Sequence, residues 1–179
     1  MRRDDAEGWK YVAIDESNHG KFPEILVAAL SNTDSHVAER SRHAFPKLRK
    51  YHQGLDKKLA NKGIDYSFLL YTLADYEADR DKMFGIIVGS LLVGFDFRSP
   101  INVYIDGELR NPRKEYVERA LMAVTGFRIC NIAIHSGADL DKRVELVNAA
   151  DEIAHSLYKK TLEKGAVHPK KRNLRRDFI

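Results

Sequence analysis

The sequence contains almost no cysteine, and this scarcity excludes two kinds of structure. Cys130 is the only cysteine among 179 residues. A single thiol cannot form an internal disulfide, and it cannot build a cysteine-rich zinc site. Stability must therefore come from a packed core, and a chain of 179 residues is long enough to form one as a single domain.

Long apolar stretches are also missing. The longest apolar segment, residues 83–97, is interrupted by three glycines, a serine and Asp96, and it falls short of a membrane helix of roughly 20 apolar residues. The first residues carry no apolar stretch of signal-peptide length. We therefore expect a cytoplasmic protein that does not associate with membranes.

Two familiar catalytic motifs are absent as well. The sequence has no G-x-S-x-G motif, and no Gly-Lys-Ser/Thr follows the glycines of residues 83–97. The first motif would carry a serine nucleophile, and the second would form a phosphate-binding loop. The absence of both motifs is consistent with a reaction that needs no nucleophilic side chain from the protein.

The sequence does contain a surplus of basic residues. The formal net charge is +4, and the sequence pI is about 9.1. An excess of positive charge favours a polyanionic partner such as nucleic acid, but solvated helix faces and tails give the same pattern. The basic residues form two groups, Arg40, Arg42, Lys47, Arg49, Lys50, Lys57, Lys58 and Lys62 near the middle and Lys159, Lys160, Lys164, Lys170, Lys171, Arg172, Arg175 and Arg176 near the end.

The pattern of apolar residues predicts an α/β fold. Short apolar runs predict strands at residues 9–15, 24–30, 65–73, 102–105 and 128–134, and helical spacing predicts helices within 35–61 and at 76–92, 112–124 and 143–163. The first two strands are expected to form a hairpin. The last two strands alternate with helices, so they should pair in parallel. We expect a mixed five-stranded sheet, with the first three strands antiparallel and the later ones parallel, flanked by helices.

Two of the expected strands end in a carboxylate. Tyr-Val-Ala-Ile is followed by Asp15 and Glu16, and Asn-Val-Tyr-Ile is followed by Asp106 and Gly107. Burying an unpaired charge is costly, and open α/β sheets bind ligands at the carboxyl ends of their strands. We therefore expect Asp15 and Asp106 to be functional, although each could also be only the polar residue that ends a strand.

A third carboxylate comes from the last expected helix. On a helical wheel of about 3.6 residues per turn, Asp151 falls at the edge of the apolar stripe of Leu146, Ala150, Ile153 and Leu157. Its side chain can face the sheet and still touch water. A boundary aspartate without a functional role would occupy the same place.

These three carboxylates favour a metal site. Carboxylates that lie together repel one another unless a cation joins them. Oxygen ligands without a cysteine cluster suit Mg²⁺ or Mn²⁺, and two such ions can activate water and stabilise the leaving oxygen of a phosphodiester. The residues thus favour a divalent-metal-dependent phosphodiester hydrolase in which Asp15, Asp106 and Asp151 hold the metal.

Three short motifs resemble the ribonuclease H-like superfamily. They are Ile-Asp-Glu-Ser at 14–17, Tyr-Ile-Asp-Gly at 104–107 and Asn-Ala-Ala-Asp-Glu-Ile-Ala at 148–154. The chain is similar to type 2 ribonuclease H. At its C-terminus it is more similar to a largely uncharacterised family with an N-terminal D-E-S and a C-terminal Q-x-A-D-x-x-A helix, where Asn148 stands in the place of the Gln.

The resemblance implies a ribonuclease H-like fold over residues 1–164, followed by a basic C-terminal tail at 165–179. It implies a nuclease that acts on RNA, DNA or a hybrid by a two-metal mechanism with Mg²⁺ or Mn²⁺. Asp15, Asp106 and Asp151 would be catalytic metal ligands, with Glu16 as the fourth.

Several points stay open beside this resemblance. Asp139 or Asp141 could be the fourth acid in place of Glu16, and His135 and His155 could contact a phosphate or a metal, although both are more often surface residues. Type 2 ribonucleases H carry a Gly-Arg-Gly that contacts the ribose at an RNA–DNA junction. Residues 17–20 instead read Ser-Asn-His-Gly, which argues against recognition of such a junction.

Three other interpretations differ in what the structure must contain. A binding module that kept the fold but lost catalysis would have carboxylates too far apart to share a metal. A nuclease of the PIN type usually enters a helix directly after its first acidic strand, whereas residues 15–30 indicate a hairpin. A small-molecule enzyme would have a deep apolar pocket in place of an open acidic cleft.

Overall fold

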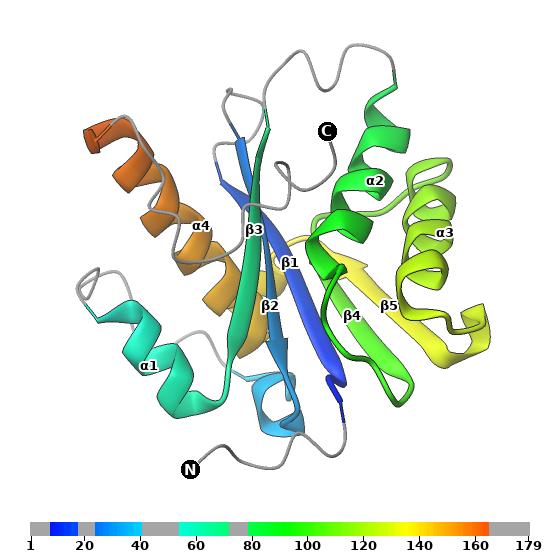
Figure 1. Cartoon of the computed structure of the whole chain (residues 1–179), viewed down its shortest axis with the longest axis horizontal. Coiled ribbons are helices and arrows are strands. Elements are labelled where there is room, and N and C mark those ends of the chain that lie inside the picture. The colour runs from blue at the N-terminus through cyan, green and yellow to red at the C-terminus, as the bar shows by residue number, and fades with distance from the viewer. Residues whose placement is uncertain (1–7, 18–23, 41–53, 72–78, 165–179) are drawn as a thin grey trace.

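The computed structural model describes residues 8–17, 24–40, 54–71 and 79–164, and in these ranges one sheet carries helices on both faces (Figure 1). Its strands are β1 (Tyr11–Ser17), β2 (Glu24–Ser31), β3 (Asp65–Tyr71), β4 (Ile101–Asp106) and β5 (Ile132–Gly137). Its helices are α1 (Leu55–Lys62), α2 (Arg80–Leu92), α3 (Arg113–Thr125) and α4 (Glu145–Lys164). Three short 3-10 helices in these ranges are η1 (Asp34–His36), η5 (Ile129–Asn131) and η6 (Leu140–Lys142).

The strands lie in the order β3-β2-β1-β4-β5. β2 is antiparallel to β1 and to β3, whereas β4 is parallel to β1 and to β5. The expected mixed sheet is therefore confirmed, with its first three strands antiparallel and its later strands parallel. Because β1 lies at the centre, it joins the antiparallel half of the sheet to the parallel half.

Alternation of side chains along the strands gives the sheet two apolar faces. α2 and α3 cover the face that presents Ile14 and Val103, and α1 and α4 cover the face that presents Ala13 and Val27 (Figure 1). α4 packs mainly on β1 and β2 and has little contact with β4. Among the described residues, no helix packs extensively on the α4-side face of β5, and His135 on this face is exposed.

α2 and α3 pack closely because two glycines of α2 face α3. A Cβ atom at Gly85 would lie 2.7 Å from the Cβ atom of Tyr116, and a Cβ atom at Gly89 would lie 3.1 Å from that of Ala120. The absence of a side chain at these positions lets the two helix backbones approach each other. The glycines of the apolar segment thus serve helix packing.

Several expected boundaries differ from the structure by one or more residues, and two of these differences have a clear physical reason. The strand expected at 128–134 begins only at Ile132, because η5 precedes it and Ile129 is 44% exposed, so its side chain adds little to the core. The helix expected from residue 76 is α2, and the carboxylate of Asp79 caps it by accepting the N–H groups of Asp81 and Lys82. Residues 76–78, the segment 41–53 and the tail 165–179 lie outside the described residues.

No helix in the described ranges has the length and apolar character needed to cross a membrane.

Candidate active site

Asp15 and Asp106 lie on the same face of the sheet, at the carboxyl ends of neighbouring strands. β1 and β4 pair in parallel as far as Ile14 and Ile105, and each aspartate directly follows its paired isoleucine. Adjacent strands are about 4.8 Å apart, so the two carboxylates are close neighbours. Asp15 is only 6% exposed, whereas Asp106 is half-buried.

The charge of Asp15 is strongly disfavoured by its surroundings. Burial raises the pKa of the Asp15 carboxyl well above its ordinary value of 3.8. The carboxylates of Asp151, Asp106 and Asp141 raise this pKa further, and the hydrogen bond from the N–H of Glu16 opposes them (N to Oδ1 2.7 Å). Aspartates from β1, β4, η6 and α4 therefore lie near enough to one another for their negative charges to repel.

Asp141 is the fourth member of this aspartate cluster, which comprises Asp15, Asp106, Asp141 and Asp151. Burial raises the pKa of Asp141, and the charges of Asp106 and Asp151 raise it further. Asp141 lies within η6, directly before the last helix. The cluster therefore contains Asp141, one of the two aspartates that the sequence offered as a fourth acid in place of Glu16.

Asp106 also fixes the segment that leads into α4. Its Oδ1 atom accepts the backbone N–H of Leu140 at 2.9 Å and that of Asp141 at 3.4 Å. These hydrogen bonds hold η6 against the end of β4, and α4 begins at Glu145, shortly after η6 ends. Asp106 thereby helps to position the helix that carries Asp151.

Asp151 lies half-buried in α4, at the border of the face that packs on β1 and β2. Ala150 and Ala154 beside it are fully buried. Their small side chains let the helix backbone approach the strands, and this approach brings Asp151 close enough to raise the pKa of Asp15. The structure therefore brings Asp151 together with the two aspartates at the strand ends.

Glu16 points away from this aspartate cluster. Successive residues of a strand face opposite sides of the sheet, so Glu16 lies on the α2 side while Asp15 lies on the α4 side. On the α2 side the hydroxyl of Tyr71 forms a short hydrogen bond with buried Glu24 and lies 3.3 Å from Oε2 of Glu16. Glu16 is not among the charges that act on Asp15.

The remaining candidates lie at the margin of the cluster or outside it. Asp139 is exposed and forms an ion pair with Lys142. His135 lies inside β5 and stacks on Tyr104, and His155 is half-buried on α4.

Ser17 is a candidate residue that the sequence reasoning passed over. Its side chain follows Asp15 on the same face of β1, it is buried, and its hydroxyl has no hydrogen-bond partner in the described structure. A buried hydroxyl without a partner is costly. The D-E-S motif was the available signal, because it places a hydroxyl two residues after the aspartate.

The donor chemistry of the cluster suits a divalent metal ion. Carboxylate oxygens, together with the unpartnered hydroxyl of Ser17, are the hard ligands that Mg²⁺ and Mn²⁺ prefer. As the described side chains lie, no three His, Cys, Asp or Glu residues are close enough together to hold an ion. The residues therefore fit such an ion by their chemistry, and the carboxylates would have to draw together to bind it.

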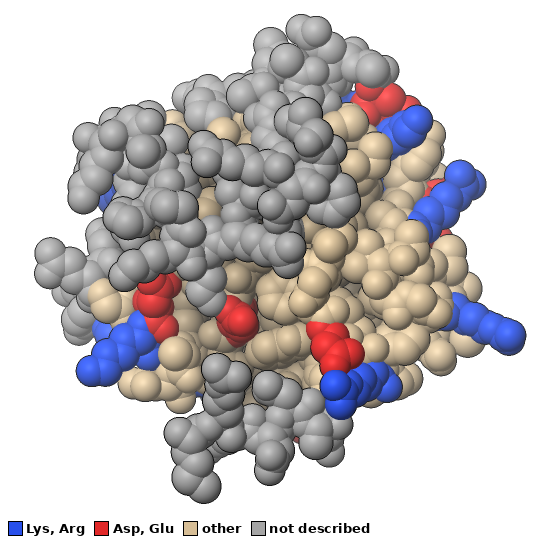
Figure 2. All heavy atoms as spheres, viewed as in Figure 1, with Lys and Arg blue, Asp and Glu red and all other residues tan. Residues whose placement is uncertain are grey.

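Only some of the lysines and arginines in the two basic groups of the sequence belong to the described residues. On the face drawn in Figure 2, the Lys and Arg side chains of the described residues lie mostly at the periphery, and several have an acidic neighbour. Arg40 and Lys62 both pair with the buried Glu145, for example. The described residues on this face do not form a continuous basic groove.

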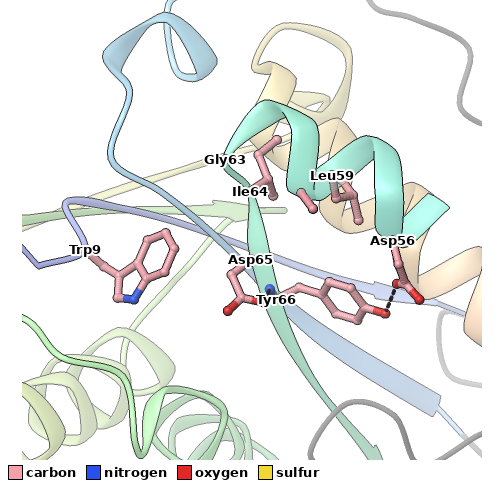
Figure 3. Close-up of a pocket in the computed structure, with 8 residues that line it drawn as sticks. Trp9, Asp56, Leu59, Gly63, Ile64, Asp65 and Tyr66 are labelled. Atoms are coloured by element: carbon pink, nitrogen blue, oxygen red, sulfur yellow. Dashed lines mark hydrogen bonds between the residues drawn. The ribbon is translucent and has the colours of Figure 1, made fainter. Parts of the chain in front are cut away.

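A pocket of about 330 Å³ lies at the opposite end of the sheet (Figure 3). It is lined by Trp9, just before β1, and by residues at the junction of α1 and β3, where Tyr66 donates a hydrogen bond to Asp56 at 2.8 Å. Burial and this hydrogen bond raise the pKa of Tyr66. Because Asp15 lies near the far end of β1, this pocket is not the apolar cavity beside the carboxylates that a small-molecule enzyme would need.

Comparisons with known proteins agree with this topology. No family model matches the sequence, and no curated protein matches it by sequence. Ribonuclease HII from Archaeoglobus fulgidus, solved in complex with PCNA, is similar over 94% of this chain and 85% of that chain, with a TM-score of 0.50 and 16% identity. A variant of Bst-RNase HIII is similar over 92% of this chain and 58% of that chain, with a TM-score of 0.51 and 16% identity. The sheet order and these similarities show that the chain has a ribonuclease H-like fold.

Proposed function

We propose that this protein is a divalent-metal-dependent phosphodiester hydrolase, a nuclease that acts on RNA, DNA or a hybrid. The observation that carries the proposal is the placement of Asp15 and Asp106 side by side at the carboxyl ends of the parallel strands β1 and β4. Asp151 and Asp141 lie near enough for their charges to raise the pKa of buried Asp15 as well. Carboxylates gathered in this way at the ligand-binding edge of an α/β sheet favour a cation as the missing partner. The fold similarity to ribonucleases HII and HIII supports a nuclease.

Asp15, Asp106 and Asp151 would hold Mg²⁺ or Mn²⁺, with Asp141 as the fourth ligand. Glu16, the fourth ligand that the family resemblance implies, would first have to turn from the α2 side of the sheet, where it lies near the hydroxyl of Tyr71. Bound ions of this kind supply an activated water and stabilise the leaving oxygen of a phosphodiester. The protein contributes the placement of its carboxylates. Asp106 accepts the N–H of Leu140 through Oδ1, which ties the end of β4 to η6 and leaves its Oδ2 atom for an ion.

Asp106→Asn tests the proposed nuclease. Asparagine keeps an oxygen that can accept the N–H of Leu140 but loses the charge, so the variant should fold like the wild type. Its cleavage of end-labelled RNA, DNA and hybrid strands with Mn²⁺ or Mg²⁺ should be at least about 100-fold slower. Asp34→Asn, at an exposed aspartate in η1, is the matched control and should cleave at the wild-type rate. Undiminished cleavage by Asp106→Asn would rule out the proposed mechanism.

A non-catalytic nucleic-acid-binding module on the same fold is the second candidate. The observation that favours it is the open spacing of the described carboxylates, of which no three lie close enough to hold an ion. Thermal melting with increasing Mn²⁺ separates the two candidates, because a ligand that binds only the folded state raises the melting temperature. Binding of nucleic acid without stabilisation by Mn²⁺ and without cleavage would favour the module.

A further inference from the structure

The α4-side face of β4 and β5 carries a pair of stacked rings. Tyr104 of β4 and His135 of β5 are partners in the parallel register, and their ring centroids lie 4.6 Å apart at an interplanar angle of 15°. Tyr104 also borders the core beneath α4, whereas His135 is exposed. Because β5 is the edge strand of the sheet, the stack ends at a surface that another planar group can reach.

This stack lies beside the aspartate cluster. Tyr104 comes two residues before Asp106 on the same face of β4, and two residues along a strand span about 6.6 Å. His135 comes two residues before Gly137, which is the register partner of Asp106. A base stacked on the outer face of His135 therefore lies on the same side of the sheet as Asp106, one strand away and two residues before the end of β5.

A cation borders the same place. Nη2 of Arg143 lies 4.0 Å from the Cβ position of Gly137, so the guanidinium lies near the end of β5. Arg143 pairs with Glu39 (Nη1 to Oε1 3.6 Å), and the two side chains are 48% and 67% exposed. Exposed ion pairs contribute little free energy, so this guanidinium can exchange Glu39 for a phosphate oxygen.

We propose that Tyr104 and His135 form a stacking site for one unpaired base of a nucleic acid, with Arg143 beside a neighbouring phosphate. This deepens the proposed nuclease function and rests on it for the identity of the occupant. Aromatic side chains on open sheet surfaces bind bases by stacking, with little dependence on sequence. Bases inside a duplex have no open face, so the substrate class is a single strand or a duplex with unpaired nucleotides next to the cleaved bond.

Binding of short labelled oligouridylate and oligothymidylate, measured by fluorescence anisotropy in EDTA, tests the stacking site without cleavage. His135→Ala should weaken binding by about tenfold, whereas His135→Phe keeps a ring and should bind like the wild type. A strand with abasic sites keeps its phosphates but cannot stack, so its affinity for the wild type should fall by a similar factor. Ile86→Ala, at a 48% exposed side chain of α2 on the other side of the sheet, is the control and should change nothing.

Arg143→Gln gives an independent readout of the phosphate contact. The variant should bind both strands more weakly, and the dependence of its affinity on salt should decrease by about one phosphate contact. If the salt dependence of the affinity is unchanged, Arg143 does not contact a phosphate of the bound strand.

The stacking site and the nuclease can fail separately. Equal affinity of His135→Ala and the wild type, equal affinity for abasic and normal strands, or no binding of any single strand by the wild type would overturn the stacking site. If the wild type binds single strands through His135 but cleaves none of them with Mn²⁺, the stacking site is supported and the proposed nuclease activity is contradicted. Duplex bound as tightly as single strands would also contradict an unpaired base as the occupant.

Discussion

Asp15→Asn is expected to make the metal-free protein more stable at neutral pH. In the wild type the Asp15 charge is opposed by burial and by the carboxylates of Asp151 and Asp106. Asparagine removes this charge and keeps an oxygen that can accept the N–H of Glu16. We expect a gain of about 0.5–2 kcal/mol in the free energy of unfolding, seen as a rise of the melting temperature by about 2–4 °C per kcal/mol.

This gain should depend on pH in one direction. Because the folded state raises the pKa of Asp15 above 3.8, folding favours the protonated carboxyl and disfavours the charged one. Below a pH of about 3.8 the carboxyl is protonated in both folded and unfolded chains, so it contributes no penalty. As the pH rises through 3.8 to the raised pKa, the wild type should lose stability relative to Asp15→Asn. A difference in melting temperature that is as large in acid as at neutral pH would contradict this cause.

Divalent metal should stabilise the wild type more than Asp15→Asn, which is the reverse of the difference expected without metal. Mn²⁺ should raise the melting temperature of the wild type and leave that of Asp15→Asn nearly unchanged, because the variant lacks a ligand. Cleavage by the variant should fall at least about 100-fold. Asp34→Asn is again the matched control, since this aspartate is exposed in η1 and lies outside the aspartate cluster. Equal stabilisation of wild type and Asp15→Asn by Mn²⁺ would exclude Asp15 as a ligand.

Gly85→Ala is expected to destabilise the protein, although alanine is the better helix former. The new Cβ atom would lie 2.7 Å from the Cβ atom of Tyr116 and 2.8 Å from its carbonyl carbon and oxygen. Backbone atoms of α3 cannot move aside as a flexible side chain can, so α2 and α3 must separate. Overpacking against a rigid backbone costs up to about 3 kcal/mol, and the gain in helix propensity offsets only about 1 kcal/mol of it.

Gly89→Ala is the matched control for this packing prediction. It lies one turn later in α2 and gains the same helix propensity, but its nearest new neighbour is the methyl group of Ala120 at 3.1 Å. We expect urea unfolding to show a clear loss of stability for Gly85→Ala and a change close to zero for Gly89→Ala. If both variants were equally stable, the close approach at Tyr116 would not limit this interface.

The central strands could be predicted from the sequence because their residues are buried on both faces. β1 and β2 read as short apolar runs, and nearly all their side chains are buried. The same rule misplaced the start of β5. Ile129 and Cys130 continue an apolar run, but they form η5 and both are exposed, so at this sheet edge an apolar residue does not report a core position.

The sequence could predict only those residues of the candidate site whose position follows from the strand or helix that carries them. Asp15 and Asp106 stand at strand ends, a position that apolar runs reveal. The contribution of Asp141 depends on η6, which Asp106 holds through the N–H groups of Leu140 and Asp141, and no sequence pattern reports that contact. The opposite directions of Asp15 and Glu16 follow from the two-residue period of a strand, which places neighbouring residues on opposite faces of the sheet, whereas the family resemblance assigns both residues to one metal site.

The central place of β1 has a consequence for the order in which the protein folds. β1 meets β2 through a short connection, whereas it meets β4 only after the long intervening chain has closed, and closing that loop costs conformational entropy. The hairpin can therefore form while Asp15 is still far from Asp106 and Asp151. Repulsion among these carboxylates should oppose only the late docking of β4 and α4 onto the hairpin. We therefore expect that a cation that neutralised them would accelerate this last step of folding and would leave formation of the hairpin unaffected.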